Sequence, residues 1–322
     1  RAAAAIMKRR RRSEVFPGRG SGGEAAGLND HGDGLDADHP PVKGRSTALE
    51  KPYFRLGGLP DPEEVRPPRV LAESLAVVKH RWAADQDYTY AREQLKSIRQ
   101  DLTVQHVFDD LAADAYETHA RVAIEADDMG EFNACQAQLQ RLHAAGFRVA
   151  SAAEFCAYRI LFNSVVPPPG QRPQLVLSLL QELNPRALGH PFIAQALDAH
   201  RAIEAQDFGA FFRLWPLMAN LGACFLDRVV PDMRRGALAA ACASFEPTLP
   251  LARLAQLLGL RNEKACRDYL ERHHGATSEH IVVAEAHSMT DPHDYGRQGA
   301  STQWLELRTR AFRQRQRTRS AG

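Results

Sequence analysis

The stretch Ile124-Glu-Ala-Asp-Asp-Met-Gly-Glu-Phe132 returns later in the chain as Ile203-Glu-Ala-Gln-Asp-Phe-Gly-Ala-Phe211, with six of nine positions identical. The two copies start 79 residues apart (203 − 124), about the length of two helical hairpins of the tetratricopeptide or HEAT kind. Each copy predicts the end of a helix, a tight Asp/Gly turn, and an aromatic residue at the start of the next helix that packs into the groove between the two helices. The repeat favours an α-solenoid over a single bundle; a chance match of a short window is the alternative.

Helical periodicity dominates the chain from Pro67 onward. Ser151 followed by Glu154 predicts a capping box that opens a helix over 152–165. Strand-like texture is nearly absent before 281–283. We therefore expect an all-α fold, built as an α-solenoid of TPR-like helical hairpins.

The pattern changes near the C-terminal end of the helical stretch. Helices are expected over 251–258 and 262–273, separated by Gly259, and a short apolar strand follows at 281–284. A helix, a tight turn, a second helix and a strand are typical of a winged helix. On the second helix the expected inward residues are Ala265, Tyr269 and Leu270. The expected outward residues are Lys264, Arg267 and Arg272.

The composition is that of an ordinary globular protein, with 322 residues of which 44% are hydrophobic and 25% charged. Because 41 Lys and Arg face 39 Asp and Glu, any affinity for nucleic acid must come from local patches. The five cysteines form no C-x-x-C pair, which disfavours a disulfide framework or a structural zinc site and indicates a reducing compartment. No run approaches the roughly 18 apolar residues that span a bilayer, so no membrane partner is expected.

Both ends of the chain differ in composition from its centre. The first 50 residues hold a basic run, 8–12, and a stretch rich in Gly, Asp and Ser with few large apolar side chains. The basic run is typical of a nuclear import signal or of a solvated stretch of charge without a function. The arginines over 308–319 are compatible with contacts to RNA phosphates or with a disordered tail. The expected organisation is a disordered basic/Gly-rich tail at 1–50, a helical-repeat solenoid at 51–248, a winged helix at 249–290 and an Arg-rich disordered tail at 291–322.

The sequence lacks the motifs of the common catalytic sites. There is no P-loop, no G-x-S-x-G and no H-E-x-x-H, and the thirteen histidines are not spaced as helical metal ligands. We therefore expect no enzyme activity, no cofactor and no metal site.

Two groups of polar residues are candidates for a structural or docking role. Glu117, His119 and Arg121 are spaced two apart, which places neighbours on nearly opposite faces of a helix and favours separate buried polar networks. Arg99 and Asp101 are expected at a corner between helices, where they satisfy free backbone groups and pair with charges on the following helix. An edge for partner docking is the alternative for this corner.

Several longer blocks together resemble a known family. In chain order they are Lys51-Pro-Tyr-Phe-Arg-Leu, Asp61-Pro-Glu-Glu-Val-Arg-Pro, Gln86-Asp-Tyr, Glu93-Gln-Leu-Lys-Ser-Ile-Arg-Gln-Asp-Leu-Thr-Val-Gln, Tyr116-Glu-Thr-His-Ala-Arg, Glu131-Phe-Asn-Ala-Cys-Gln, Glu154-Phe-Cys-Ala-Tyr-Arg-Ile-Leu and Phe211-Phe-Arg-Leu. Over about 51–290 the chain resembles the SAC3/GANP family. It is most similar to the branch with the leukocyte receptor cluster member 8 homologues and the yeast THP3-like proteins.

The resemblance implies a fold and a role. The fold is the PCI architecture, an α-solenoid that ends in a winged helix, and the role is a nuclear scaffold in mRNA processing and export. The implied partners are a second PCI-domain protein, a small acidic DSS/Sem-type protein, and RNA or DNA bound on a basic surface formed by the joined winged helices. Carried over by position, the nucleic-acid contacts are Arg261, Lys264, Arg267 and Arg272.

Two features depart from the family pattern. The stretch 275–299 is rich in His, Asp and Ser where a basic wing is expected, and no Phe-Gly-repeat extension is present. These departures favour the shorter branch linked to transcription elongation and splicing. They also leave open a subunit of another PCI complex, of the proteasome-lid, signalosome or initiation-factor type, that does not contact nucleic acid.

Overall fold

The protein is mostly helical, as the sequence predicts, and its computed structural model describes residues 40–277, 280–285, 303–309, 312 and 316. The helices are α2 (Pro68–Asp85), α3 (Tyr88–Val104), α4 (Asp110–Ala126), α5 (Met129–Ala144), α6 (Val149–Val165), α7 (Arg172–Glu182), α8 (Pro185–Leu188), α9 (Pro191–Glu204), α10 (Phe208–Leu214), α11 (Gly222–Leu226), α12 (Val230–Ser244), α13 (Leu251–Leu257) and α14 (Glu263–His274). Short 3-10 turns lie between α6 and α7 (Pro169–Gln171) and between α10 and α11 (Trp215–Leu217). The strands are β1 (Thr248–Pro250), β2 (Ile281–Glu285) and β3 (Gln303–Arg308).

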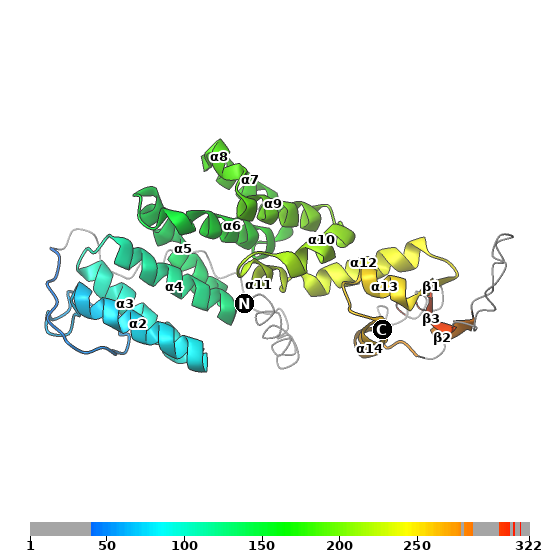
Figure 1. Ribbon diagram of the computed structural model, residues 1–322, viewed down its shortest axis with the longest axis horizontal. Helices are drawn as coiled ribbons and strands as arrows, with labels where there is room; N and C mark the ends of the chain where they lie inside the picture. Colours follow the sequence, from blue (N-terminus) through cyan, green and yellow to red (C-terminus); the bar gives the residue numbers. More distant parts are fainter. Residues whose placement is uncertain (1–39, 278–279, 286–302, 310–311, 313–315, 317–322) are drawn as a thin grey trace, which may run out of the picture.

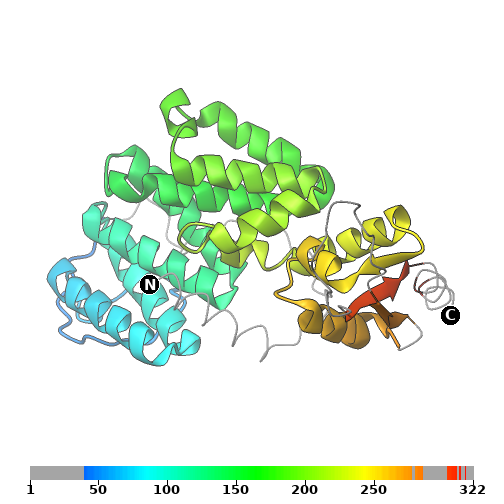
Figure 2. The same cartoon turned by 45° about the vertical axis from the view of Figure 1, so that its right-hand side comes forward.

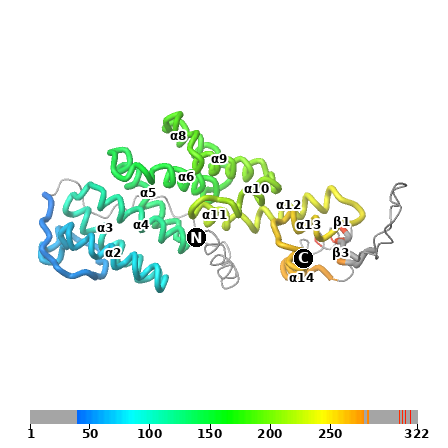
Figure 3. Tube along the Cα trace, in the orientation of Figure 1, coloured from blue at the N-terminus to red at the C-terminus, as the bar shows by residue number. Residues whose placement is uncertain are grey.

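The helices follow one another along an elongated molecule. Figure 1 shows α2, α3 and α4 at one end and the small sheet with α13 and α14 at the other. The tube in the same orientation shows the chain progressing from one end to the other (Figure 3). One connected set of buried apolar side chains runs through the described helices, so the array has a continuous core.

Both copies of the sequence repeat form the same local structure. The first copy joins α4 to α5 and the second joins α9 to α10. In each copy an aspartate at the same position, Asp128 or Asp207, caps the next helix, because its carboxylate accepts from the backbone amide three residues further on. Phe132 and Phe211 are both 0% exposed. The predicted helix end, turn and packed aromatic are therefore confirmed at both places.

The predicted capping box at Ser151 is wrong. Helix α6 begins earlier, at Val149, after Arg148 in the left-handed backbone region (φ 45°). The Ser151 hydroxyl bonds instead to Glu117 on α4, and the Glu154 carboxylate bonds to Arg121, also on α4. The spacing of Ser151 and Glu154 fits a capping box, but both side chains form hydrogen bonds with residues of α4 instead of with the backbone amides at the start of α6.

The C-terminal part contains the predicted helix, tight turn, helix and strand. The turn between α13 and α14 needs Gly259, because its φ is +62° and a Cβ there would lie 2.4 Å from the ring of Phe212. Asn262 then caps α14, its side chain accepting from the Ala265 amide. The expected strand at 281–284 is β2.

The sheet itself holds strands that the sequence did not reveal. Its order is β1-β3-β2 and both pairings are antiparallel, with Leu249 opposite Leu307 and Ile281 opposite the same Leu307. The central strand β3 lies in the segment expected to be a disordered tail, so the prediction for 291–322 is wrong at 303–308. Figure 2 shows this strand, in red, beside the helices of the C-terminal part.

Parts of both expected tails also pack on the body of the protein. Thr309 is buried and its hydroxyl donates to the carbonyl of Phe245 (2.7 Å), while Phe312 is 1% exposed. At the other end, the backbone amide of Val42 donates to the carbonyl of Val104 at 3.0 Å. The prediction of disorder up to residue 50 is thus wrong for 40–50, and its remaining part, 1–39, lies outside the described residues.

Candidate interaction surfaces and buried polar networks

Helix α14 carries the predicted basic residues toward solvent. Lys264 and Arg272 are exposed, as is Arg261 in the turn before the helix, whereas Arg267 is half-buried. Leu270 faces the core as predicted and is 0% exposed. The predicted inward residues Ala265 and Tyr269 are only half-buried, and the sequence reasoning missed Cys266, which is fully buried beside Leu270.

The basic residues of α14 alternate with acidic ones. Glu263, Asp268 and Glu271 lie on the same helix, so its surface is mixed in sign. Within the described residues, none of the four basic side chains makes an ion pair with these or other carboxylates. Arg272 Nε donates to the backbone carbonyl of Asp268 at 3.1 Å. These cations are therefore available to an anionic partner.

A stacked arginine fixes α14 against the helices before it. The guanidinium of Arg234, on α12, lies 5.9 Å from the ring centre of Tyr269 and 5.7 Å from that of Trp215. Its Nε donates to the carbonyl of Leu258 at 3.0 Å. Burial lowers the pKa of Arg234 from its usual value, as expected for a cation held among aromatic rings.

Asp101 ties the N-terminal segment to α3. One of its carboxylate oxygens accepts from Nε of Arg66 at 2.6 Å, and the other accepts from Lys51 at 2.9 Å. Arg66 and Asp101 are 0% and 1% exposed in their side chains. Asp101 therefore pairs with the segment that precedes α2 and not with the following helix, which corrects the sequence prediction. The sequence reasoning also missed Arg66, since nothing in Arg66-Pro-Pro indicates burial.

Arg99 faces the opposite way, toward α4 and α5. Its guanidinium lies 3.1 Å from Nδ1 of His119 and 3.6 Å from a carboxylate oxygen of Glu131. Burial lowers the pKa of His119 well below its usual value, and the charges of Arg99 and Lys96 lower it further. The imidazole is therefore neutral, with Nδ1 accepting from Arg99 and Nε2 turned toward Glu131 at 3.7 Å.

Glu117 is the centre of a second network, between α4, α5 and α6. It is 0% exposed, and its carboxylate accepts from Arg148 Nε (3.0 Å), Arg121 (3.3 Å), His143 (3.3 Å) and the hydroxyl of Ser151. Burial alone would raise the pKa of Glu117, but these hydrogen bonds and the two guanidinium charges lower it to about 2. Arg121 also forms a two-bond pair with the Glu154 carboxylate, at 3.0 and 2.8 Å.

Among the described hydrogen bonds and ion pairs the two networks share no residue, as the spacing of Glu117 and His119 predicts. Arg121 joins Glu117, one helical turn away, so these two are not separate. Glu131, Ser151 and Glu154 were missed as network members because each pairs with a residue distant in sequence. Within the described part of the chain, no three His, Cys, Asp or Glu side chains are grouped to hold a metal ion.

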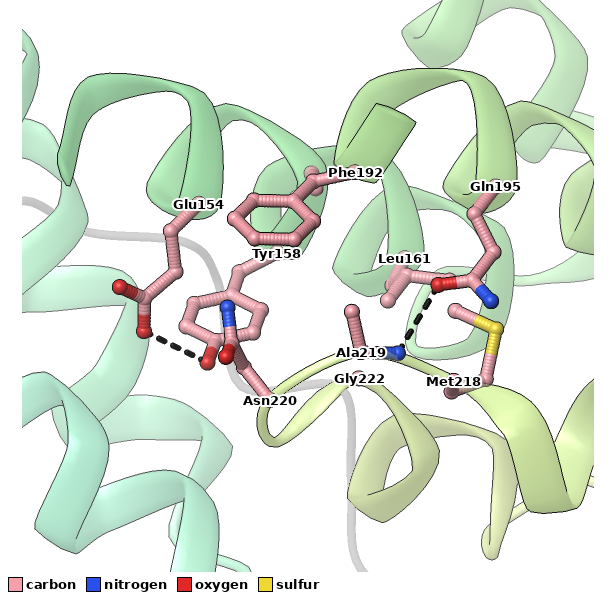
Figure 4. Close-up of a pocket in the computed structure, with 10 residues that line it drawn as sticks. Glu154, Tyr158, Leu161, Phe192, Gln195, Met218, Ala219, Asn220 and Gly222 are labelled. Atoms are coloured by element: carbon pink, nitrogen blue, oxygen red, sulfur yellow. Dashed lines mark hydrogen bonds between the residues drawn. The ribbon is translucent and has the colours of Figure 1, made fainter. Parts of the chain in front are cut away.

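A small cavity adjoins this second network, and Figure 4 shows the residues around it. Its volume is about 10 Å³, room for a single water. Tyr158 donates its hydroxyl hydrogen to Glu154 (2.8 Å) and accepts from the amide of Leu221 (3.1 Å). The side-chain carbonyl of Gln195 accepts from the backbone amide of Ala219 (2.8 Å). Helices α6 and α9 thus hold the loop before α11 in place, and the cavity is too small for a substrate.

The comparisons with known proteins identify the family. The model of the SAC3/GANP family matches residues 51–141 and 128–279. This chain belongs to the SAC3/GANP family. It is 38% identical to the leukocyte receptor cluster member 8 homolog of Xenopus laevis, over 74% of this chain and 29% of that protein. It is 34% identical to a THP3 homolog of Schizosaccharomyces pombe, over 73% of this chain and 58% of that protein.

A third member of the family, SAC3 family protein A of Arabidopsis thaliana, is 37% identical over 70% of this chain and 22% of its own length. The chain therefore spans less than two thirds of each of these relatives. The matched region covers the helical array and α14 but ends before β2 and β3. Among the described helices, none is long and apolar enough to cross a membrane.

Proposed function

We propose that this protein is a non-enzymatic scaffold subunit of a nuclear PCI complex that acts in mRNA processing, transcription-coupled splicing or export. In this proposal it pairs with a second PCI-domain protein, accompanied by a small acidic DSS/Sem-type protein, and the pair presents a composite surface to RNA or DNA. Membership of the SAC3/GANP family, whose model matches residues 51–141 and 128–279, is the observation that carries the proposal.

The arrangement of elements supports the PCI architecture. Successive helices from α2 to α12 stack into an elongated array, which we interpret as a solenoid over about 51–248 (Figure 1). Helix α13, the Gly259 turn, α14 and the three-stranded sheet follow, and we interpret them as a winged helix. This subdomain then extends beyond 249–290, because β3 supplies its central strand.

The proposed nucleic-acid contacts are Arg261, Lys264, Arg267 and Arg272. Their support is physical: the exposed members carry positive charges without carboxylate partners among the described residues, and α14 holds the place of a recognition helix in a winged helix. Lysine and arginine in such positions bind phosphates and release counterions, which makes affinity depend on salt.

A scaffold also suits the chemistry of the buried groups. The pKa values of Glu117 and His119 are both lowered, yet both side chains are buried and turned to neighbouring helices. Their partners hold α3, α4, α5 and α6 together. We interpret them as structural residues.

One observation favours a second candidate, a subunit that binds only proteins. The segment 275–299 has four acidic residues and one arginine where a winged helix that binds nucleic acid often has a basic wing. A mixed-charge α14 without a basic wing would then pack against a partner protein.

Charge reversal on α14 distinguishes the two candidates. The double variant Lys264→Glu/Arg272→Glu changes exposed side chains only, and Arg69→Glu/Arg186→Glu is a matched control on α2 and α8. Binding of the full chain to fluorescein-labelled poly-uridine RNA is measured by anisotropy over a series of salt concentrations. If both residues contact phosphates, the slope of log affinity against log salt falls by about 1.4 in the α14 variant.

The control variant should keep the slope of the unaltered protein. An unchanged slope in the α14 variant, with RNA still bound, overturns the assignment of these contacts. No measurable RNA binding by the chain alone, or by its purified complex with a PCI partner, favours the protein-only subunit.

A further inference from the structure

A groove of about 510 Å³ lies between α5, α6 and α7, away from the proposed nucleic-acid surface. Its volume falls within the usual range for ligand sites, about 300 to 1,000 Å³. The apolar part of its wall comes from Phe155 and Cys156 on α6 and from Leu179 and Leu183 at the end of α7. Figure 1 shows these three helices next to one another at the middle of the array.

The groove contains a partly buried arginine without a counter-ion. Arg159 projects from α6, its Nη1 donates to the side-chain carbonyl of Asn133 at 2.6 Å, and its guanidinium lies 5.6 Å from the ring centre of Phe162. No carboxylate lies within ion-pair distance of it among the described residues. Burial lowers the pKa of Arg159 from its usual value, and the charge of Glu182 on α7 opposes this lowering only in part.

A second arginine stands at the rim. Arg141, on α5, is exposed and donates to the neutral side-chain amide of Gln138 at 3.4 Å. Among the described residues that line the groove, Glu182 on α7 is the one carboxylate. Two arginines and one glutamate leave an excess of positive charge on a wall that is partly apolar and partly polar.

The floor of the groove has an unsatisfied polar group. Gln136 lines it and is 2% exposed, its side-chain amide donates to the carbonyl of Phe155 at 3.1 Å, and its Oε1 has no hydrogen-bond partner among the described residues. A buried acceptor without a partner is destabilising, and a ligand that donates a hydrogen bond to it would remove this cost. Backbone amides of a peptide are such donors.

We infer that this groove docks a short acidic peptide segment of a partner protein, with its aliphatic side chains on Leu179 and Leu183 and its carboxylates on Arg141 and Arg159. Charge complementarity favours this occupant, because two arginines and one glutamate line the groove and neither arginine forms an ion pair among the described residues. The leucines of α7 add an apolar contact surface. A nucleic acid is the poorer match, because it carries a negative charge at every phosphate and only two arginines of the described residues line the groove. The inference does not depend on the proposed function.

Fluorescence anisotropy of a labelled peptide tests the assignment. The probe is a fluorescein-labelled peptide of alternating glutamate and leucine residues, titrated with the full chain, and its control has lysine in place of glutamate. We expect saturable binding of the acidic peptide, and binding at least roughly tenfold weaker for the double variant Arg141→Gln/Arg159→Gln.

Two further variants guard against loss of folding. Arg141→Glu alters one exposed side chain at the rim and should weaken binding several-fold, whereas Arg186→Glu, exposed on α8 outside the groove, should not change it. Circular dichroism melting curves establish that each variant folds. The Lys264→Glu/Arg272→Glu variant should bind the peptide normally, so failure here and failure of the proposed function are separate results.

Three outcomes would overturn the inference. These are equal affinity of the acidic and lysine peptides, unchanged affinity in Arg141→Gln/Arg159→Gln, and no saturable binding by the unaltered chain. Displacement of the peptide by poly-uridine RNA would assign the groove to nucleic acid and would likewise overturn it.

Discussion

Replacing Glu117 with glutamine keeps the shape of the side chain but removes the charge at the centre of the network between α4, α5 and α6. The pKa of Glu117 is lowered from 4.5 to about 2. At about 1.4 kcal/mol per pH unit, this lowering corresponds to roughly 3 kcal/mol of folding free energy at neutral pH. The side chain is 0% exposed, so solvent screening does not reduce the figure further.

The sign of the pH dependence follows from the direction of the shift. Because the pKa is lower in the folded state, the stabilisation is complete above about pH 4.5 and is lost as the pH falls toward 2. Urea denaturation of wild type and Glu117→Gln should therefore differ by roughly 3 kcal/mol near neutral pH, and by less than half of that near pH 3.

A control on the same helix isolates the network. Glu125, also on α4, has no ion pair within the described residues, so Glu125→Gln should change the free energy of unfolding by less than about 0.5 kcal/mol. If Glu117→Gln costs no more than this control, or if its cost is the same at both pH values, the electrostatic reasoning is refuted.

Two further predictions concern packing and a buried ion pair. Leu270→Ala should lower the free energy of unfolding by roughly 2 to 5 kcal/mol, whereas Arg272→Ala, on the exposed face of the same helix, should change it by less than about 0.5; equal shifts in thermal midpoint would mean that α14 is turned otherwise. Asp101→Ala should cost about 3–5 kcal/mol, since Arg66 is left buried without its partner. Hydrogen exchange should then rise first in 40–50, and protection equal to wild type there would contradict the role given to Asp101.

The parts of the fold that the sequence predicts best are those set by local patterns. The repeated turn before Phe132 and Phe211 and the Gly259 turn are local, because a cap or a left-handed glycine is specified within a few residues. The alternation of buried and exposed positions on α14 is likewise local, although Tyr269 is less buried than expected.

The missed features all depend on residues far apart in the sequence. Ser151 is a sound cap by pattern, yet it serves Glu117, 34 positions earlier (151 − 117). Arg66 is buried only because Asp101 lies across from it, and no periodicity signals such a pair. Strand β3 was assigned to a tail because its neighbours are rich in arginine, and composition does not reveal pairing with β1 and β2.

The position of β3 has a consequence for how the protein is made. The strand begins 53 positions after the end of β1 (303 − 250) and yet separates β1 from β2, which do not pair with each other. On the ribosome, the helical array can fold as it emerges, but the sheet stays incomplete until residue 308 has left the exit tunnel. Until then both earlier strands present unpaired edges, so a chaperone or an early-binding partner has a defined place to act. A fragment cut at residue 290 would remain in that state permanently.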